Sequence, residues 1–345
     1  MELSELMFDL PPSLVAAHPP KERAAARLMV IEKDGGKVTH SVFSSLGEFL
    51  RPGDLLVLND TRVFPARLRG KKESGGQVEV LLVEPFPQWQ NLWICLIDAA
   101  KKPKVGGRIH LRGGIAAEVI GDMGKGRYGV KFHCRGNILD LLEELGEPPL
   151  PPYIGRARAL EPSDWERYQT VYASNPGAIA APTAGFHFTP ELLASLRSRG
   201  AETAFLTLHV GPGTFQPVRE NIVERHRMEG ERYLLRSEAA AKILEAKASG
   251  RRVIGVGSTS TRALEWIARK KGSVVADEGI ARLFIYPGEP FRVIDGLITN
   301  FHLPGSTPLV LVAAFAGLEL VRRAYEEAVQ LGYRFYSYGD AMLIL

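Results

Sequence analysis

Two hydrophobic patterns alternate along the chain and divide it into an α/β part and an all-β part. Near the N-terminus, the segments LMVIE (28–32) and DLLVLND (54–60), each with an apolar run, predict strands, with a short helix between them over residues 42–50. Beyond residue 200, the runs AFLTLHV and RRVIGVG are almost continuously apolar, which is typical of strands buried on both faces. The periodic segments SEAAAKILEAKASG and STRALEWIARKKG predict crossover helices, and residues 308–331 predict one long helix.

Residues 64–132 have a different pattern, in which short strand-like runs follow one another without a helical period. The runs are ARLRG, QVEVLLVEP, LWICLID, RIHL, AAEVIG and RYGVKF. Closure into a small barrel is how such strands avoid exposed edges. We therefore expect an α/β domain of residues 1–66 and 150–345, with mostly buried strands and crossover helices, interrupted by an inserted β-barrel domain of residues 67–149.

Several local signals refine the helix and strand boundaries. The stretch 138–155 is helical at first and ends in a proline cluster that suits a return linker. Ser163 and Glu166 have the spacing of a capping box, and Thr189-Pro190 is a typical helix start. The segment LFIYP predicts a further short strand.

Composition indicates the size of the core, the cellular compartment and whether a membrane segment is expected. A chain of 345 residues with 45% hydrophobic content can bury a sizeable core in two domains. Two cysteines, Cys95 and Cys134, are too few for a disulfide framework, which fits a reducing compartment. The longest apolar stretch, residues 309–318, is shorter than the roughly 20 residues that a membrane span needs. We expect a cytoplasmic protein without a membrane segment.

The candidate site residues lie in polar segments that follow predicted strands. Gly and Pro fix the backbone in these segments, while Thr and His supply donors and acceptors, as expected where a rigid scaffold presents a site. The segments are APTAGFHFT (181–189), HVGPGTFQPV (209–218), GSTSTRAL (257–264) and TNFHLPGST (299–307). Residues 59–62, NDTR, also follow a buried strand, where they face a ligand or form an Asx turn. Together these segments predict one composite polar site.

Histidines and helix starts allow more than one interpretation. His187, His209, His226 and His302 could suggest a metal, but their spacing matches no metal motif, so we expect none. The hydroxyl run before Arg262 suits an anion at a helix N-terminus, or only a well-capped helix. Net charge is +4, which permits an anionic partner. Clustered basic residues could follow a phosphate backbone, among them Lys101, Lys102, Lys104, Arg156 and Arg158.

Taken together, the motifs resemble one family, the S-adenosylmethionine:tRNA ribosyltransferase-isomerases of queuosine biosynthesis. The resemblance covers essentially the whole chain and rests on FDLP (8–11), LNDTRV-PARL, the four polar segments above and FYSYGDAMLI (335–344). The chain departs from the family pattern at three positions. Glu229 stands where the family has a second histidine, Gly305 where it has a lysine, and His18 where it has a glutamine.

The resemblance implies transfer and isomerisation of the ribosyl group of S-adenosylmethionine onto the aminomethyl group of a deazaguanine base in the tRNA anticodon. S-adenosylmethionine is then a cosubstrate, no metal or other bound cofactor is needed, and the chain is expected to act as a monomer. The chemistry requires a base near the sulfonium, because that cation acidifies the neighbouring C5′ hydrogens. Two other classes stay open, a metal-dependent hydrolase and a non-catalytic tRNA-binding protein.

We assign candidate roles on this basis. The nominees for proton transfer are His209, His187, His302 and Asp60. The nominees for substrate binding are Asn59, Thr61, Arg62, Thr183, Phe188, Gly211, Thr214, Phe215, Ser260, Arg262, Asn300 and Ser306. The nominees for gripping the tRNA anticodon arm are Lys101, Lys102, Lys104, Arg156 and Arg158.

Overall fold

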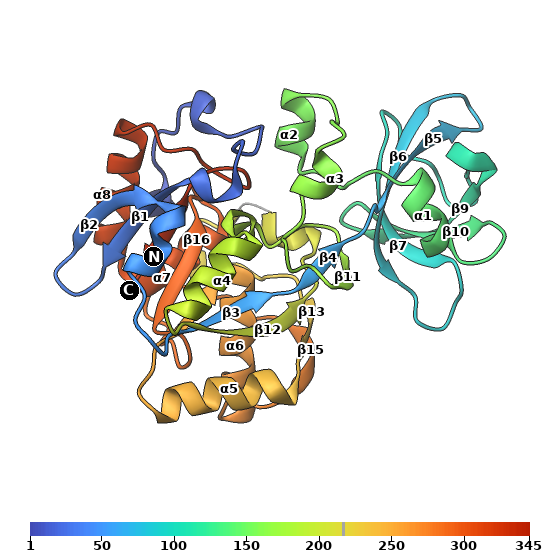
Figure 1. The fold of residues 1–345 in the computed structure, drawn as a ribbon. Coiled ribbons are helices and arrows are strands. Elements are labelled where there is room, and N and C mark those ends of the chain that lie inside the picture. Colours follow the sequence, from blue (N-terminus) through green and yellow to red (C-terminus); the bar gives the residue numbers. More distant parts are fainter. Residues whose placement is uncertain (216–217) are drawn as a thin grey trace. The chain divides into compact units, whose positions relative to one another are not determined.

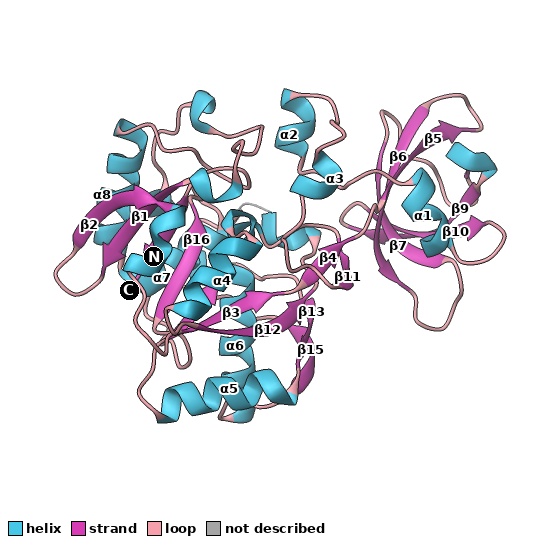
Figure 2. Cartoon of the chain, in the orientation of Figure 1, coloured by secondary structure: helices cyan, strands magenta, loops and turns pink. Residues whose placement is uncertain are grey.

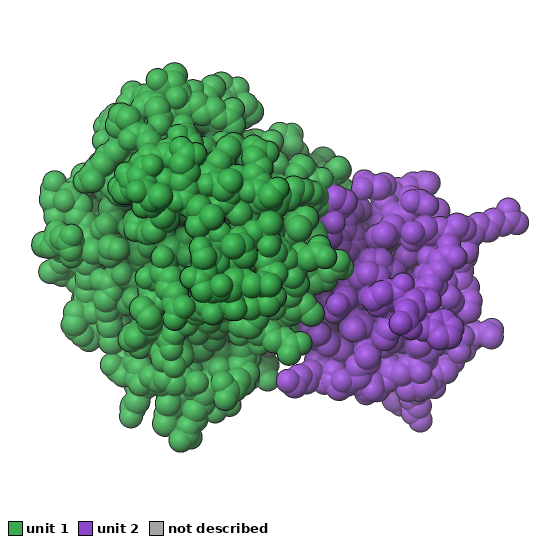
Figure 3. Space-filling model, turned by 90° about the horizontal axis from the view of Figure 1, so that it is seen from below, with its two compact units in different colours: residues 1–62, 152–175, 181–345 green, residues 63–151, 176–180 purple. Residues whose placement is uncertain are grey.

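The structure is a computed structural model of the chain that describes all residues except 216–217, and it leaves the side chains of residues 156, 157, 214 and 215 undescribed. The chain forms two compact units, coloured green and purple in Figure 3. The larger unit consists of Met1–Arg62, Pro152–Asn175 and Ala181–Leu345, and the smaller unit of Val63–Pro151 and Pro176–Ala180.

A mixed sheet forms the centre of the larger unit (Figure 1). In spatial order, the described strands are β15 (Asp277–Ala281), β13 (Glu231–Leu235), β12 (Glu202–Leu208), β3 (Leu55–Asn59), β14 (Val253–Val256), β16 (Gly296–Asn300), β17 (Ala341–Ile344), β1 (Arg27–Glu32) and β2 (Lys37–Val42). Strands β12, β3, β14 and β16 run parallel to one another. Their carboxyl ends therefore share one edge of the sheet.

Helices cover the sheet on both faces (Figure 2), so every residue of its central strands β3, β14 and β16 is buried. On one face, Leu56 and Leu58 pack in a core with Leu192 and Leu196 of α4. Helices α5 and α6 contact the central strands as well. The α-helices of this unit are α2 (Pro152–Ala157), α3 (Asp164–Arg167), α4 (Pro190–Ser198), α5 (Ser237–Ala248), α6 (Ser258–Lys271), α7 (Thr307–Ala316) and α8 (Leu318–Gln330).

The smaller unit is a closed antiparallel barrel. Its strands, in spatial order, are β10 (Arg127–His133), β7 (Leu92–Asp98), β6 (Gln77–Pro85), β5 (Arg67–Lys72), β8 (Arg108–Leu111) and β9 (Ala116–Gly124). Alternate strand residues such as Val80, Cys95 and Val130 fill the interior, and Ile138 and Leu142 of α1 (Ile138–Leu145) join that core. An α/β sheet together with an all-β barrel confirms the predicted fold class.

Short elements complete the chain. A two-stranded sheet pairs β4 (Thr61–Val63) with β11 (Asn175–Ala178). The 3-10 helices are η1 (Leu3–Leu6), η2 (Pro12–Leu14), η3 (Arg23–Ala25), η4 (Phe43–Glu48), η5 (Arg112–Gly114), η6 (Thr183–His187), η7 (Pro212–Phe215) and η8 (Val223–Arg225).

Four local predictions differ from the structure. The helix predicted over 42–50 is η4, preceded by the unpredicted strand β2. The predicted helix 308–331 is two helices, because Gly317 adopts a left-handed φ of 90° between them. The LFIYP segment is irregular, with β15 before it. No capping box forms at Ser163, whose side chain makes no cap hydrogen bond.

The predicted start of helix α4 is confirmed. Thr189 accepts a hydrogen bond from the Leu192 backbone N–H at 3.1 Å, and Pro190 follows it at the first helical position. Both features suit a helix N-terminus, because a threonine oxygen satisfies one of the unpaired amides and proline needs none.

Candidate active site

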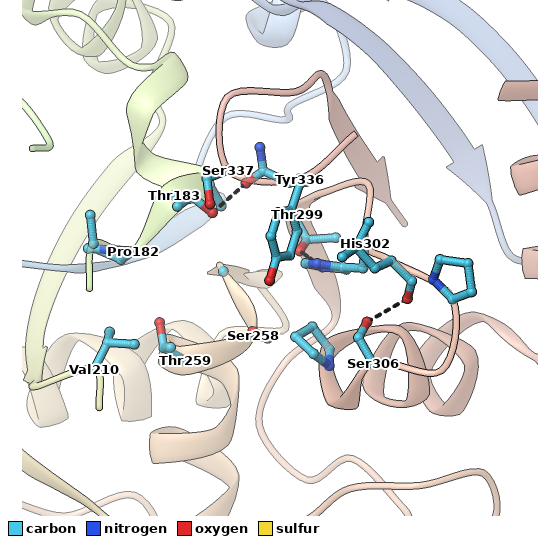
Figure 4. Close-up of a pocket in the computed structure, with 17 residues that line it drawn as sticks. Pro182, Thr183, Val210, Ser258, Thr259, Thr299, His302, Ser306, Tyr336 and Ser337 are labelled. Carbon is cyan, nitrogen blue, oxygen red and sulfur yellow. Dashed lines mark hydrogen bonds between the residues drawn. The ribbon is translucent and has the colours of Figure 1, made fainter. Parts of the chain in front are cut away.

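A pocket of about 190 Å³ lies in the larger unit where the carboxyl ends of the parallel strands meet (Figure 4). Its lining comes from the segments that follow β12, β14 and β16, from η6 and from the turn before β17. The lining residues are Ala181, Pro182, Thr183, Ala184, Val210, Gly257, Ser258, Thr259, Thr299, Asn300, His302, Leu303, Pro304, Ser306, Pro308, Tyr336 and Ser337. Segments far apart in the sequence thus meet in one polar site.

Asn300 links two of these segments. Its Oδ1 accepts a hydrogen bond from Thr183 Oγ1 at 2.9 Å, and its Nδ2 lies 3.1 Å from His187 Nε2. An amide nitrogen donates, so His187 Nε2 is the acceptor. Burial, with Arg334 and Arg23 nearby, lowers the pKa of His187 to about 3. His187 is therefore a neutral group behind Asn300, and it is absent from the pocket lining.

His302 is the nominated histidine that lines the pocket. Its Nε2 lies 2.8 Å from Thr299 Oγ1, and its backbone N–H donates to Tyr325 Oη at 3.1 Å. Burial lowers the pKa of His302 to about 3. The imidazole is therefore neutral at pH 7, held by its neighbours at the entrance to α7.

The hydroxyl run at the start of α6 divides into two groups. Ser258 and Thr259 line the pocket. Ser260 instead donates to the Val256 carbonyl at 2.8 Å, and Thr261 donates to the Gly257 carbonyl at 3.1 Å, inside the helix start. The nominated Ser260 is therefore fully buried and bonded within the scaffold, whereas its two predecessors face the pocket.

Arg262 is part of a buried ion pair. Its Nη2 contacts Glu231 Oε2, and the Arg262 and Glu231 residues are only 3% and 4% exposed. The other Glu231 oxygen accepts from the Gly211 backbone N–H at 3.0 Å. This ion pair ties α6 to β13 and to the segment after β12. It leaves the guanidinium outside the pocket wall, although an anion-binding role was expected from the sequence.

Residues 59–62 are also bonded mainly to the scaffold. The Asn59 side chain makes two hydrogen bonds with the Leu208 backbone. Its Nδ2 donates to the Leu208 carbonyl at 2.9 Å, and its Oδ1 accepts from the Leu208 N–H at 3.0 Å. Asp60 accepts from Thr207 Oγ1 at 2.6 Å and from Asn175 Nδ2 at 2.8 Å. Asp60 lines a separate pocket of about 550 Å³. The structure therefore does not bring Asp60 together with His302, and Arg62 is exposed on β4.

His209 follows β12 directly and is half-buried. Its Nδ1 lies 2.9 Å from Thr61 Oγ1, which is also 3.5 Å from the Asn175 carbonyl. Burial, with a contribution from Arg232, lowers the pKa of His209. Val210, the next residue, lines the pocket. His209 therefore lies one residue from the pocket wall, with one ring nitrogen held.

The remaining substrate nominees are in different environments. Ser306 lines the pocket, and its Oγ donates to the Leu303 carbonyl at 2.7 Å. Phe188 is fully buried and packs edge-on against Phe43, with ring centroids 5.0 Å apart, so it belongs to the core. Thr214 and Phe215 have side chains outside the described part of the structure.

The residues nominated for tRNA binding are also in different environments. Lys101 and Lys104 are exposed in the loop between β7 and β8, and Lys102 contacts the Ile97 carbonyl. Arg158 makes a bidentate pair with Asp164, at 2.6 and 2.8 Å. Burial opposes ionisation of Asp164, but this pairing holds its pKa below the usual value. Arg158 is thereby occupied within the larger unit, and the Arg156 side chain lies outside the described residues.

The three departures from the family pattern have structural settings. Gly305 has a φ of +65°, and a Cβ built there would lie 3.1 Å from Met7 Sδ, so a larger residue would require an adjustment. Glu229 lies against Gly213, where a Cβ would approach the Glu229 Cβ to 2.9 Å. His18 is exposed, with its Nδ1 3.5 Å from Glu161.

Several residues of the pocket wall are not among the residues nominated from the sequence. Thr299, Tyr336 and Ser337 line the pocket beside Ser258 and Thr259. Each of them lies in a segment already picked out, ITNFHLPGST, FYSYGDAMLI or GSTSTRAL. The motifs therefore located the site, while the choice of residue within each motif depended on tertiary packing.

Two further observations apply to the described residues only. No group of three or more His, Cys, Asp or Glu side chains is arranged to hold a metal ion. No helix in the same part of the chain has the length and apolar character needed to cross a membrane.

A polar pocket at the carboxyl edge of buried parallel strands is typical of α/β enzymes that bind small ligands. The chain belongs to the queuosine biosynthesis protein family, whose sequence profile matches residues 3–344. It is 49% identical over 344 residues to the S-adenosylmethionine:tRNA ribosyltransferase-isomerase of Pelobacter propionicus, and 50% identical over 344 residues to that of Geobacter metallireducens, with 100% of each chain covered. The resemblance inferred from the motifs is thereby confirmed.

A solved structure agrees with this assignment. The crystal structure of S-adenosylmethionine tRNA ribosyltransferase from Thermotoga maritima matches with a TM-score of 0.56 and 35% identity. The match covers 99% of this chain and 100% of that one. Similarity along the full length therefore extends from sequence to fold.

Proposed function

We propose that the protein transfers and isomerises the ribosyl group of S-adenosylmethionine onto 7-aminomethyl-7-deazaguanine at the wobble position of tRNA. The products are epoxyqueuosine-tRNA, adenine and methionine. The observation that carries this proposal is full-length membership of the family, with relatives near 49% identity that bear this activity in their names. The pocket described above is the site to which we assign the reaction.

The starts of two helices support binding of the methionine carboxylate. Ser258 and Thr259 lie at the first positions of α6, and Ser306 is the residue directly before α7, without a capping hydrogen bond from its side chain. Unpaired backbone amides and the positive end of a helix dipole both favour an anion. We assign the carboxylate of S-adenosylmethionine to this side of the pocket.

We assign different chemistry to the nominated histidines. His302, with a pKa of about 3, is neutral and weakly basic, so it suits hydrogen bonding to departing adenine or to ribose hydroxyls. His187 acts through Asn300, as a positioning residue. We therefore place both histidines at the site and assign the role of general base to neither.

His209 is our candidate for the base that removes a C5′ proton. Thr61 Oγ1 can donate to the Asn175 carbonyl and accept from His209 Nδ1–H. In that tautomer Nε2 carries the lone pair that a base requires. We regard Asp60 as a scaffold residue, because Thr207 and Asn175 already bond its two oxygens.

We propose that the larger unit is the catalytic domain and that the barrel helps to grip the anticodon arm. A wobble base lies in a single-stranded loop and can be moved into a pocket at modest cost. The reaction, as we propose it, uses no metal or other bound cofactor, and the enzyme acts as a cytoplasmic monomer.

The test is incubation of the purified protein with S-adenosylmethionine and tRNA carrying the aminomethyl-deazaguanine base, followed by adenine detection and nucleoside mass spectrometry. Adenine release with a matching ribosyl-derived gain in nucleoside mass is the expected result. A tRNA with unmodified guanine at the wobble position is the matched control. Methyl gain would identify a methyltransferase, tRNA binding without product would favour a binding protein, and loss of activity with a chelator would favour a metal enzyme.

A further inference from the structure

The pocket of about 550 Å³ that Asp60 lines lies beside one edge of β12, within the larger unit. Successive strand residues point to opposite faces of a sheet. Thr203 and Phe205 line this pocket from one face of β12, and Ala204 lines it from the other face, so the pocket lies against the edge of the strand. Arg197 of α4 and the start of α5 complete its walls. We call this pocket the edge groove.

The edge of β12 that faces the groove has unpaired backbone groups. On its other side β12 is bonded to β3 through its even-numbered residues, as at the Glu202 N–H, which donates to the Asp54 carbonyl at 2.8 Å. On the groove side, pairing with β13 is limited to residues 207–208. The backbone groups of Thr203 and Phe205 point to that side, and in the described part of the chain no backbone hydrogen bond reaches them. Such an edge is ready to bind a partner.

Two guanidinium groups beside this edge have no acidic partner among the described residues. Arg197 is exposed, and its Nη2 lies 3.5 Å from Thr203 Oγ1. Arg236, the residue directly before α5, is exposed as well. Lys242 differs from both, because its Nζ lies 3.0 Å from Glu238 Oε1. The groove therefore presents two arginine charges that the protein does not neutralise.

The remaining lining adds aromatic surface and no free carboxylate. The Tyr172 and Phe205 rings are half-buried, with centroids 5.7 Å apart. Asp60 is acidic, but its two oxygens accept from Thr207 Oγ1 and Asn175 Nδ2. Arginines beside aromatic rings are typical of grooves that hold unpaired nucleotides, because the charges bind phosphates and the rings stack on bases.

We propose that the edge groove binds unpaired nucleotides next to the wobble base, with Arg197 and Arg236 on their phosphates. This inference rests on the proposed function. Backbone N–H groups and arginines are common phosphate donors. One end of the groove adjoins the candidate base, because Asp60 precedes Thr61, whose Oγ1 lies 2.9 Å from His209 Nδ1. An RNA strand is favoured over an acidic peptide, since the proposed substrate presents its wobble base in a single-stranded loop.

Filter binding of anticodon stem-loop RNA to the full chain over a range of salt tests the proposal. The double variant Arg197→Gln/Arg236→Gln should bind about tenfold more weakly, and its slope of log affinity against log salt should fall by about 1.5, as expected for two lost phosphate contacts. KM for tRNA should rise, while kcat and the affinity for S-adenosylmethionine should not change. The control is Lys37→Gln/Arg322→Gln, which removes the same charge from exposed positions on β2 and α8.

Amide hydrogen exchange followed by NMR gives a second, local measurement on the wild type. The Thr203 and Phe205 amides should exchange rapidly in the free protein and more slowly with the RNA. Protection of these amides by poly-glutamate but not by RNA would overturn the proposal in favour of a peptide site.

Other outcomes separate this inference from the proposed function. Wild-type affinity and salt slope in the arginine variant would overturn the inference and leave the proposed function standing. Self-association of that variant with unchanged RNA binding would also overturn it, because the arginines would then only protect a strand edge. A wild-type protein that binds no tRNA would overturn the proposed function as well.

Discussion

Polar side chains at one edge of the same sheet serve two different purposes. In the pocket wall, Thr299, His302 and Ser337 line the space that a ligand would occupy. Outside the pocket, Asn59 and the Glu231–Arg262 pair direct their polar groups at the protein itself. The difference shows that a polar residue after a buried strand is a site residue only if the scaffold leaves its polar groups available.

Mutations of scaffold residues and of pocket-wall residues should therefore have different effects. Loss of a scaffold group leaves its partner buried and unpaired, which lowers the free energy of unfolding. Loss of a wall group removes a ligand contact and leaves the fold largely intact. Stability and activity should therefore respond separately to the two kinds of substitution.

The largest effect is expected at the buried ion pair. Glu231→Gln leaves the Arg262 charge without its carboxylate and should lower the free energy of unfolding by about 3–5 kcal/mol. Urea denaturation followed by circular dichroism measures the change. The matched control is Glu238→Gln, which removes the exposed partner of Lys242 and should have little effect. A Glu231→Gln variant as stable as the wild type would show that the ion pair does not hold this edge.

The next effect separates the two histidines with similar pKa values. His302→Ala should reduce the rate of adenine release at saturating S-adenosylmethionine by about 100-fold, as expected for a hydrogen-bonding group at the reacting centre. His187→Ala, which acts through Asn300, should mainly raise KM for S-adenosylmethionine. Steady-state kinetics on variants that remain folded decides between these outcomes. Equal losses of kcat in both variants would place His187 at the chemistry as well.

A smaller effect should appear in the pH dependence of stability. Burial holds the pKa of both His187 and His302 at about 3, against an ordinary value of 6.5. Between these values the unfolded chain binds protons that the folded protein does not, so stability falls as the pH falls. Each histidine should contribute a loss of about 1 kcal/mol between pH 7 and about pH 5.5.

Denaturation curves at the two pH values measure this loss. His302→Gln, which cannot be protonated, should reduce the pH dependence by about the share of one histidine. The exposed His18→Gln is the control and should leave the slope unchanged. A wild-type protein whose stability is flat across the window would contradict the burial of neutral imidazoles.

Much of the fold could be predicted from periodicity because its causes are local to each element. Within the strand predicted at residues 54–60, the apolar run 55–58 has no polar face, and β3 is buried on both sides in the structure. The helix pair α7 and α8 was predicted as one helix, since an apolar run continues up to Gly317 and nothing in the pattern indicates a left-handed residue. A glycine within a helical pattern is tolerated in many helices, so the break depends on tertiary packing.

The site could be predicted only to the level of segments. Arg262 and Ser260 have the residue types of anion-binding groups, but Glu231 and the Val256 carbonyl bond them within the scaffold. Those partners come from elements whose packing the sequence pattern does not specify. Ser337, conversely, has an ordinary residue type, and it lines the pocket only because the turn before β17 places it there.

The smallest effect is expected on tRNA binding, when basic residues nominated for contact with the tRNA are replaced. Lys101 and Lys104 are exposed on the barrel, whereas Arg158 is held by Asp164. Replacing both lysines by glutamine should weaken tRNA binding several-fold and reduce the slope of log affinity against log salt by about two, because each phosphate contact releases counterions. Arg158→Gln should lower stability and leave that slope unchanged. Filter binding of the anticodon arm over a range of salt measures both slopes, and an unchanged slope in the lysine variant would exclude the barrel loop from the phosphate contacts.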